Sequence, residues 1–224
     1  GIGLTRRLLE AAGPTSTDRV IELGPGVGRT AEILLATRPA SYKGVDPSPE
    51  GREQVADVLA AHSRQTDAEY VVADAASTGL PDVSADLVVG EAMLTIQSDD
   101  HKREIIAEAA RILAPGGRYA IHELGVAPDD IDEEYYTQLR RDLARAIHVN
   151  ARPMTAAAWR GLLEDAGLVV DWVDTAPMAL LKMSRNLRDE GPGGAARIMW
   201  NVMRDKALRA RILEMRRTFT RYEK

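Results

Sequence analysis

Short apolar runs alternate with longer segments of helical periodicity along the first half of the chain. The runs predict buried strands over residues 19–23, 42–46, 69–74, 86–91 and 118–124. The segments between them place apolar residues three or four positions apart, as one face of a helix does. Because each strand is apolar along its length, both faces of the sheet should be covered. The pattern therefore predicts a doubly wound α/β fold, a three-layer sandwich with a mostly parallel sheet between helices.

Turn and cap residues mark the boundaries of these elements. A first helix over residues 2–12 ends at Gly13-Pro14. Ser48 and Pro49 predict the N-cap and the first helical position after the second strand. Ser98 opens the helix before the fifth strand, and the turn at 114–117 leads into that strand.

The second half of the chain is less regular. Residues 128–150 predict a helix with an acidic start, and Thr155 predicts the N-cap of a helix that ends at Gly167. The apolar run "LVVDWV" (168–173) predicts a sixth strand. The sequence "GPGG" (191–194) predicts a flexible joint before a final helix.

Composition and charge exclude several classes of protein. Of the 224 residues, 45% are apolar and 28% are charged, as in a globular chain with a sizeable core. The net charge of −5 disfavours a non-specific nucleic-acid binder, and no apolar run approaches membrane-spanning length. The absence of cysteine removes thiolate chemistry and favours a cytoplasmic protein. The histidines are scattered without metal-ligand spacing, so we expect no metal.

A glycine-rich loop follows the first predicted strand, in "VIELGPGVGRT" (20–30). The dinucleotide-binding pattern G-x-G-x-x-G would require glycine at position 29, which is Arg29. Glu22 stands two positions before the first glycine, so the motif is E-x-G-x-G-x-G. It resembles the first motif of the class I S-adenosylmethionine-dependent methyltransferases.

The resemblance extends in the same order over residues 15–175. Asp46 ends the second predicted strand, Asp74 ends the third, and "EAARILAPGGRYAIHE" resembles the helix, turn and fifth strand of the family. The segment "ARPMTAAAWRGLLEDAGL" is similar to the branch related to ubiquinone- and menaquinone-biosynthesis methyltransferases. The resemblance implies a Rossmann-like domain over 1–224. Its expected parts are a cofactor-binding half (1–125), a helical lid (126–155), the rest of the core (156–183) and a helical element (184–224).

The resemblance also implies S-adenosylmethionine as cofactor, with Asp46 on the ribose hydroxyls and Asp74 at the adenine amino group. The implied cofactor-binding residues are Glu22, Gly24, Pro25, Gly26, Gly28, Asp46, Pro47, Asp74, Ala75 and Glu91. A carboxylate can accept two charge-assisted hydrogen bonds from vicinal hydroxyls, and an acidic wall suits a cationic sulfonium.

The implied reaction is in-line methyl transfer to a small-molecule acceptor, for which alignment is the main task of the protein. If the acceptor must lose a proton, the candidate bases are His122, Glu123 and His148. Two other functions stay open: a catalytically silent cofactor-binding scaffold or partner subunit, and a nicotinamide-dependent oxidoreductase. Arg29 and Glu22 disfavour the latter. We expect that the protein could form a homodimer.

Overall fold

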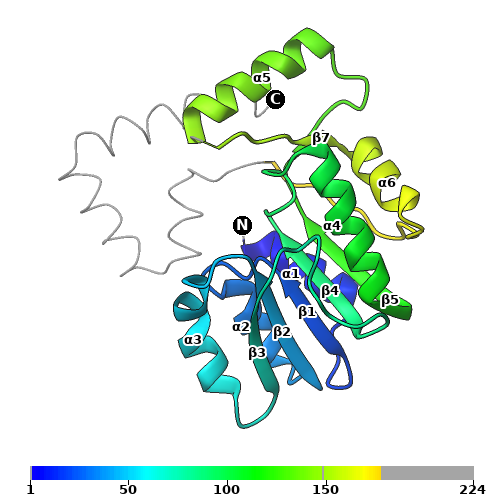
Figure 1. The fold of residues 1–224 in the computed structure, drawn as a ribbon. Coiled ribbons are helices and arrows are strands. Elements are labelled where there is room, and N and C mark those ends of the chain that lie inside the picture. Colours follow the sequence, from blue (N-terminus) through cyan, green and yellow to red (C-terminus); the bar gives the residue numbers. More distant parts are fainter. Residues whose placement is uncertain (1, 148, 178–224) are drawn as a thin grey trace, which may run out of the picture.

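A computed structural model describes residues 2–147 and 149–177 of the chain. Five parallel strands form its central sheet in the order β3-β2-β1-β4-β5 (Figure 1). Their bounds are Asp67–Val72 (β3), Ser41–Asp46 (β2), Arg19–Leu23 (β1), Ala85–Glu91 (β4) and Leu113–His122 (β5). The strand order reverses beside β1, because the chain first builds outward to β3 and then crosses over to β4. The predicted doubly wound fold is confirmed.

Helices cover both faces of this sheet (Figure 1). Those on one face are α1 (Ile2–Ala12), α2 (Arg29–Ala36) and α3 (Gly51–His62). Those on the other face are α4 (Asp99–Ile112) and α6 (Ala156–Asp165). The molecule is therefore a three-layer sandwich.

Alternation along the strands divides the core between the two faces. In β1, Val20 packs in the cluster with α1 and α2, whereas Ile21 packs in the cluster with α4 and α6. The same alternation turns Glu22, Glu91 at the end of β4, and His122 at the end of β5 toward the layer of α1 and α2. Three polar side chains thus approach one helical layer from neighbouring strands.

A helical insertion connects β5 to α6. Its helix α5 (Glu133–Ile147) lies at the top of Figure 1 and begins later than predicted. Two short parallel strands, β6 (Gly125–Val126) and β7 (Met154–Thr155), pair at its base. We call residues 126–155 the lid segment.

The return of the lid segment is anchored to the body of the domain. The Arg152 amide donates to the Thr95 carbonyl (2.7 Å), and Lys102 Nζ donates to the Arg152 carbonyl (2.9 Å). The Tyr136 hydroxyl donates to the Pro153 carbonyl (2.7 Å), which ties α5 to the same stem. The lid segment therefore rests on α4 and on the loop after β4.

The predicted start of α3 is wrong. The helix begins at Gly51, with Glu50 rather than Ser48 at the N-cap position. The Ser48 carbonyl instead accepts hydrogen bonds from the Gly51 amide (3.2 Å) and the Tyr70 hydroxyl (2.6 Å). A side chain from β3 thus holds the turn and delays the helix.

Two strand predictions are also corrected. β3 ends at Val72, so Asp74 lies in the turn beyond the strand. Residues 168–173 form no strand in the described part of the chain, despite their apolar sequence. Their backbone is bonded by a side chain, with Arg160 donating to the Val170 carbonyl (3.0 Å), and a strand needs a neighbouring backbone instead.

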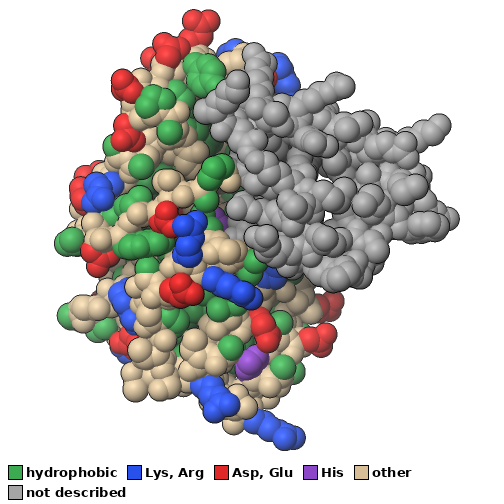
Figure 2. All heavy atoms as spheres, turned by 180° about the vertical axis from the view of Figure 1, so that it is seen from behind, with side chains coloured by type: hydrophobic (Ala, Val, Ile, Leu, Met, Phe, Trp, Pro, Cys, Tyr) green, Lys and Arg blue, Asp and Glu red, His purple; other side chains and the backbone are tan. Residues whose placement is uncertain are grey.

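His148, the predicted joint at 191–194 and the predicted helical element at 184–224 lie outside the described residues. On the face drawn in Figure 2, acidic and basic side chains are interspersed. Among the described helices, none combines the length and the apolar character needed to cross a membrane.

Candidate active site

The predicted site residues gather at the carboxyl ends of the parallel strands. The glycine loop follows β1, Asp46 ends β2, and Glu91 and His122 end β4 and β5, where they are register partners. In a doubly wound sheet, ligands bind at this edge, where the strand order reverses. The structure thus places the loop between two acidic strand ends.

The glycine loop has a backbone that side chains would oppose. Gly24 and Gly28 have φ values of 70° and 81°, in the left-handed region. A Cβ on Gly28 would lie 3.2 Å from a methyl of Val58 and 3.4 Å from one of Val55, both on α3. Glycine therefore lets α2 start close against α3, with the loop curled over the end of β1.

Asp46 stands directly beside this loop. Its Oδ1 accepts a hydrogen bond from the Ser48 amide (2.8 Å), and the Tyr70 hydroxyl lies close by, where burial and then the nearby Asp46 carboxylate raise the pKa of Tyr70. Pro47 is exposed next to it, and Pro25 lies against Gly44 of β2. The carboxylate is held by its own turn, next to the Tyr70 hydroxyl.

Asp74 lies in the turn after β3, facing the first turn of α4. Its Oδ1 accepts from the Ala76 amide (2.7 Å) and lies 3.4 Å from His101 Nε2. Ala75 is buried in the core under α4. The turn is therefore positioned by α4, and about half of the Asp74 side chain is exposed.

Glu22 is buried rather than open to the loop. Its carboxyl accepts a hydrogen bond from the Tyr42 hydroxyl (2.6 Å), and both side chains are almost fully enclosed. Burial and the nearby charge of Glu91 together raise the pKa of Glu22 to about 7, although the Tyr42 hydrogen bond lowers it. Glu22 and Glu91 are therefore two neighbouring carboxyl groups near the glycine loop.

Glu91 and His122 form a hydrogen-bonded pair, with His122 Nδ1 3.1 Å from Glu91 Oε1. Thr5 donates to Oε1 (2.7 Å) and Thr30 donates to Oε2 (2.6 Å). Burial raises the pKa of Glu91, but the hydrogen bonds from His122, Thr30 and Thr5 outweigh it and lower the pKa to about 2. The carboxylate is ionised at neutral pH, so His122 Nδ1 must carry the proton of this bond.

Glu123, the neighbouring candidate base, is occupied by a loop. One oxygen accepts from the amides of Met93 (3.0 Å) and Leu94 (2.8 Å), and the other accepts from the amide (2.9 Å) and hydroxyl (2.5 Å) of Thr95. Burial raises the pKa of Glu123, and these donors oppose that rise. The three backbone amides can only donate, so they favour the ionised carboxylate.

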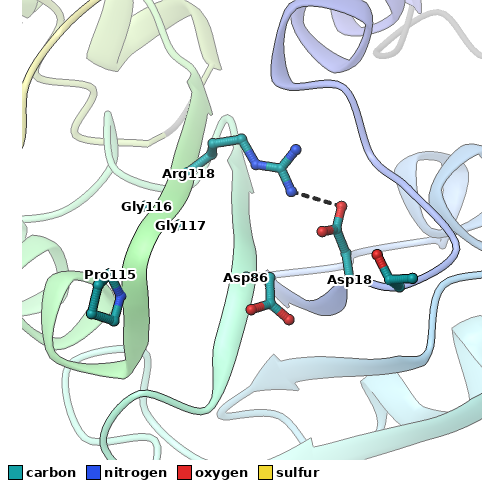
Figure 3. A pocket seen from close by; sticks show the side chains of 7 residues that line it. Asp18, Asp86, Pro115, Gly116, Gly117 and Arg118 are labelled. Carbon is teal, nitrogen blue, oxygen red and sulfur yellow. Dashed lines mark hydrogen bonds and ion pairs between the residues drawn. The ribbon is translucent and has the colours of Figure 1, made fainter.

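A polar hollow of about 270 Å³ lies at the opposite edge of the sheet (Figure 3). Its charged groups are already paired. Arg118 bonds Asp18 (2.6 Å), and Asp86 bonds Arg19 through both of its oxygens (2.9 and 3.0 Å). One pair joins β5 to the residue before β1, the other joins β1 to β4, and we assign the hollow no role in the chemistry.

The sequence analysis did not predict a role for four residues of this region: Thr5, Thr30, Tyr42 and Lys102. The first three are ordinary residues within a predicted helix or strand, and only the tertiary contacts give their hydroxyls a role. Lys102 carried a signal, because it falls on the apolar stripe of α4 with Ile105. It is fully buried there, 5.3 Å from the Trp159 ring centroid, and burial lowers its pKa.

Comparisons with known proteins agree with this geometry. A family model described as a methyltransferase domain matches residues 21–121. An uncharacterised protein of Haemophilus influenzae is 26% identical over 197 residues, covering 88% of this chain and 76% of that protein. Trans-aconitate 2-methyltransferase of Methylobacterium nodulans is 32% identical over 174 residues, covering 72% of this chain and 62% of that enzyme.

A solved structure extends the likeness of the fold. The [4+2]-cyclase SpnF superimposes with a TM-score of 0.69 at 19% identity, over 99% of this chain and 74% of the cyclase. The cyclase shows that this fold can carry more than one reaction, so the sequence family and the site must decide the chemistry. The match over residues 21–121 shows a methyltransferase domain of the S-adenosylmethionine-dependent kind, whose methyl donor is S-adenosylmethionine.

Proposed function

We propose that this protein transfers a methyl group from S-adenosylmethionine to a small-molecule acceptor that loses a proton, with His122 as the general base. The observation that carries the proposal is the Glu91–His122 pair at the carboxyl ends of β4 and β5, beside the glycine loop. Trans-aconitate 2-methyltransferase, named for a small-molecule acceptor, supports the acceptor class.

The residues present fit the cofactor. Glu91 is ionised beside the glycine loop, so its negative charge would favour a cationic ligand there, and we keep the buried Glu22 as its neighbour in the proposed cofactor site. Asp46 offers a carboxylate oxygen for ribose hydroxyls, and we keep Asp74 and Ala75 as the adenine side of the site. The loop residues Gly24, Pro25, Gly26 and Gly28, with Pro47, complete the proposed cofactor site.

When bound, S-adenosylmethionine supplies an activated methyl group on a sulfonium. The protein must align the acceptor with it and exclude water, and orientation alone can contribute roughly 7–11 kcal/mol. In the proposal, His122 accepts the acceptor's proton at Nε2, and ionised Glu91 stabilises the resulting imidazolium through Nδ1. Within the described residues, Nε2 has no hydrogen-bond partner, which supports this use of the atom.

We propose a structural role for Glu123 and not the role of a base. Its four hydrogen bonds support a role in shaping the 93–95 loop, which in turn meets the lid segment at Thr95. The lid segment would cover the acceptor, and His148 stays a candidate outside the described residues. We also propose membership of the quinone-biosynthesis-like branch, on the segment that forms β7 and α6.

Titration calorimetry tests the first half of the proposal. We expect micromolar affinity for S-adenosylmethionine and S-adenosylhomocysteine, and no comparable affinity for NAD. A silent scaffold would bind the cofactor yet release no S-adenosylhomocysteine with any acceptor of a metabolite panel. Saturation by NAD alone would instead indicate an oxidoreductase and overturn the proposal.

Substitution of His122 tests the second half. His122→Ala should keep the cofactor affinity and lower turnover by roughly a hundredfold or more. His62→Ala is the matched control, because His62 lies at the end of α3 beside Glu32 and away from the Glu91–His122 pair. Turnover at the wild-type rate in His122→Ala would remove His122 as the base.

A further inference from the structure

The Glu91 carboxylate joins three elements that are distant in sequence. It accepts hydrogen bonds from Thr5 of α1, Thr30 of α2 and His122 of β5. Thr5 and Thr30 are both buried, and Thr5 lies 86 residues before Glu91 in the chain. Each carboxylate oxygen therefore has a short hydroxyl donor, and only Oε1 is shared with the imidazole.

These hydroxyls do not follow the usual habit of threonine in a helix. A buried helical threonine commonly returns its hydroxyl hydrogen to a carbonyl one turn back. Thr37, at the end of α2, does this and donates to the Leu34 carbonyl (2.7 Å). Thr5 and Thr30 reach across to a strand end instead. The contacts of the Thr5 and Thr30 hydroxyls are therefore set by the Glu91 site and not by the helices that carry them.

The consequence for His122 follows from geometry. A carboxylate that is held at both oxygens cannot rotate away, so it presents Oε1 to His122 Nδ1 in one orientation. An acceptor fixed at Nδ1 keeps the proton there, and the lone pair of the neutral ring is then on Nε2. Thr30 also belongs to the first turn of α2, directly after the glycine loop, so the cofactor loop and the base share one anchor.

We propose that Thr5 and Thr30 are positioning residues for the base: they clamp Glu91, and Glu91 fixes the Nδ1–H form of His122. The inference rests on the proposed function, since it supplies the lone pair that the reaction uses. It assigns α1 a part in the chemistry, because one of the two clamps comes from that helix.

Imidazole nitrogen NMR of the full chain tests the clamp without any acceptor. The His122 signals are identified with His122→Asn and recorded where the rings are neutral. We expect the Nδ1–H form in the wild type and a shift toward the Nε2–H form in Thr5→Val/Thr30→Val. Thr37→Val, the matched control, should leave the His122 signals unchanged, and Thr5→Ser with Thr30→Ser should restore them.

An unchanged Nδ1–H form in the folded double variant would overturn the clamp. Circular dichroism verifies folding, and Thr30→Val alone decides if the double variant does not fold. Calorimetry with S-adenosylhomocysteine separates this result from the proposed function. If the double variant shifts toward the Nε2–H form, but the protein neither binds the cofactor nor turns over, the clamp is supported and the proposed function is contradicted. With an acceptor in hand, the double variant should lose turnover roughly tenfold to a hundredfold, part of a general base's contribution.

Discussion

The buried carboxyl of Glu22 should make the stability of this protein depend on pH in an unusual direction. Glu22 is 2% exposed, and its hydrogen bond comes from the neutral Tyr42 hydroxyl. Among residues 2–147 and 149–177, no basic side chain forms an ion pair with it. Burial raises its pKa from the ordinary value of 4.5 to about 7, and the hydrogen bond from Tyr42 only partly offsets the rise. Ionising Glu22 therefore costs the folded state free energy.

The size of this cost follows from linkage. One pKa unit corresponds to about 1.4 kcal/mol, so a rise from 4.5 to about 7 amounts to about 3 kcal/mol. Below the unfolded pKa both states are protonated, and no penalty exists. As pH rises through the folded pKa, the folded state must hold a buried charge, and the stability is lost. Glu22→Gln is neutral at every pH and can still accept from Tyr42, so it should lack this loss.

Urea unfolding followed by circular dichroism measures the difference. Between about pH 4 and about pH 8, the free energy of unfolding of Glu22→Gln should rise relative to the wild type by about 3 kcal/mol. Glu53→Gln, an exposed glutamate on α3, is the matched control and should track the wild type. A constant difference between Glu22→Gln and the wild type over this range would refute the burial argument.

Three further predictions concern the cofactor, the acid limb and the lid segment. Asp46→Ala should weaken S-adenosylmethionine binding by roughly ten- to a hundredfold in calorimetry, because charge-assisted hydrogen bonds are lost. Asp46→Asn should bind with an affinity between those of the wild type and Asp46→Ala. Unchanged affinity in Asp46→Ala would mean that Asp46 only stabilises its turn. The Arg111 guanidinium, with Thr78, holds the pKa of Glu108 at about 2, so its stabilisation should fade as pH falls from about 4.5. Glu108→Gln should therefore approach wild-type stability in acid, and a gap that persists there would contradict the pairing. Amide exchange in residues 126–155 should slow when S-adenosylhomocysteine binds; protection confined to 20–30 would rule out a lid.

The sequence alone determined the elements whose signals are local. Helical periodicity and apolar runs located the five strands and most helices, because burial of a stripe or of a whole strand is written in the spacing of residues. Ser98 was predicted to open a helix and Thr155 to cap one, and their hydroxyls accept from the amides of His101 and Ala158 (both 3.2 Å). The glycine loop and the strand ends likewise follow from short motifs, so the site's edge of the sheet could be predicted.

Tertiary structure decided what depends on partners distant in the chain. Serine is a common N-cap residue, yet the Tyr70 hydroxyl donates to the Ser48 carbonyl and the helix begins later. Residues 168–173 are apolar like a strand, but no neighbouring strand pairs with their backbone in the described part of the chain. No local pattern shows that Thr5 will bond Glu91, because the hydroxyl has several partners of similar energy and only the packing of α1 selects one. The same holds for Glu123, which the sequence indicates as a base and the fold surrounds with amides. Polar side chains acquire their roles from the donors that surround them, and the folded sheet brings those donors together.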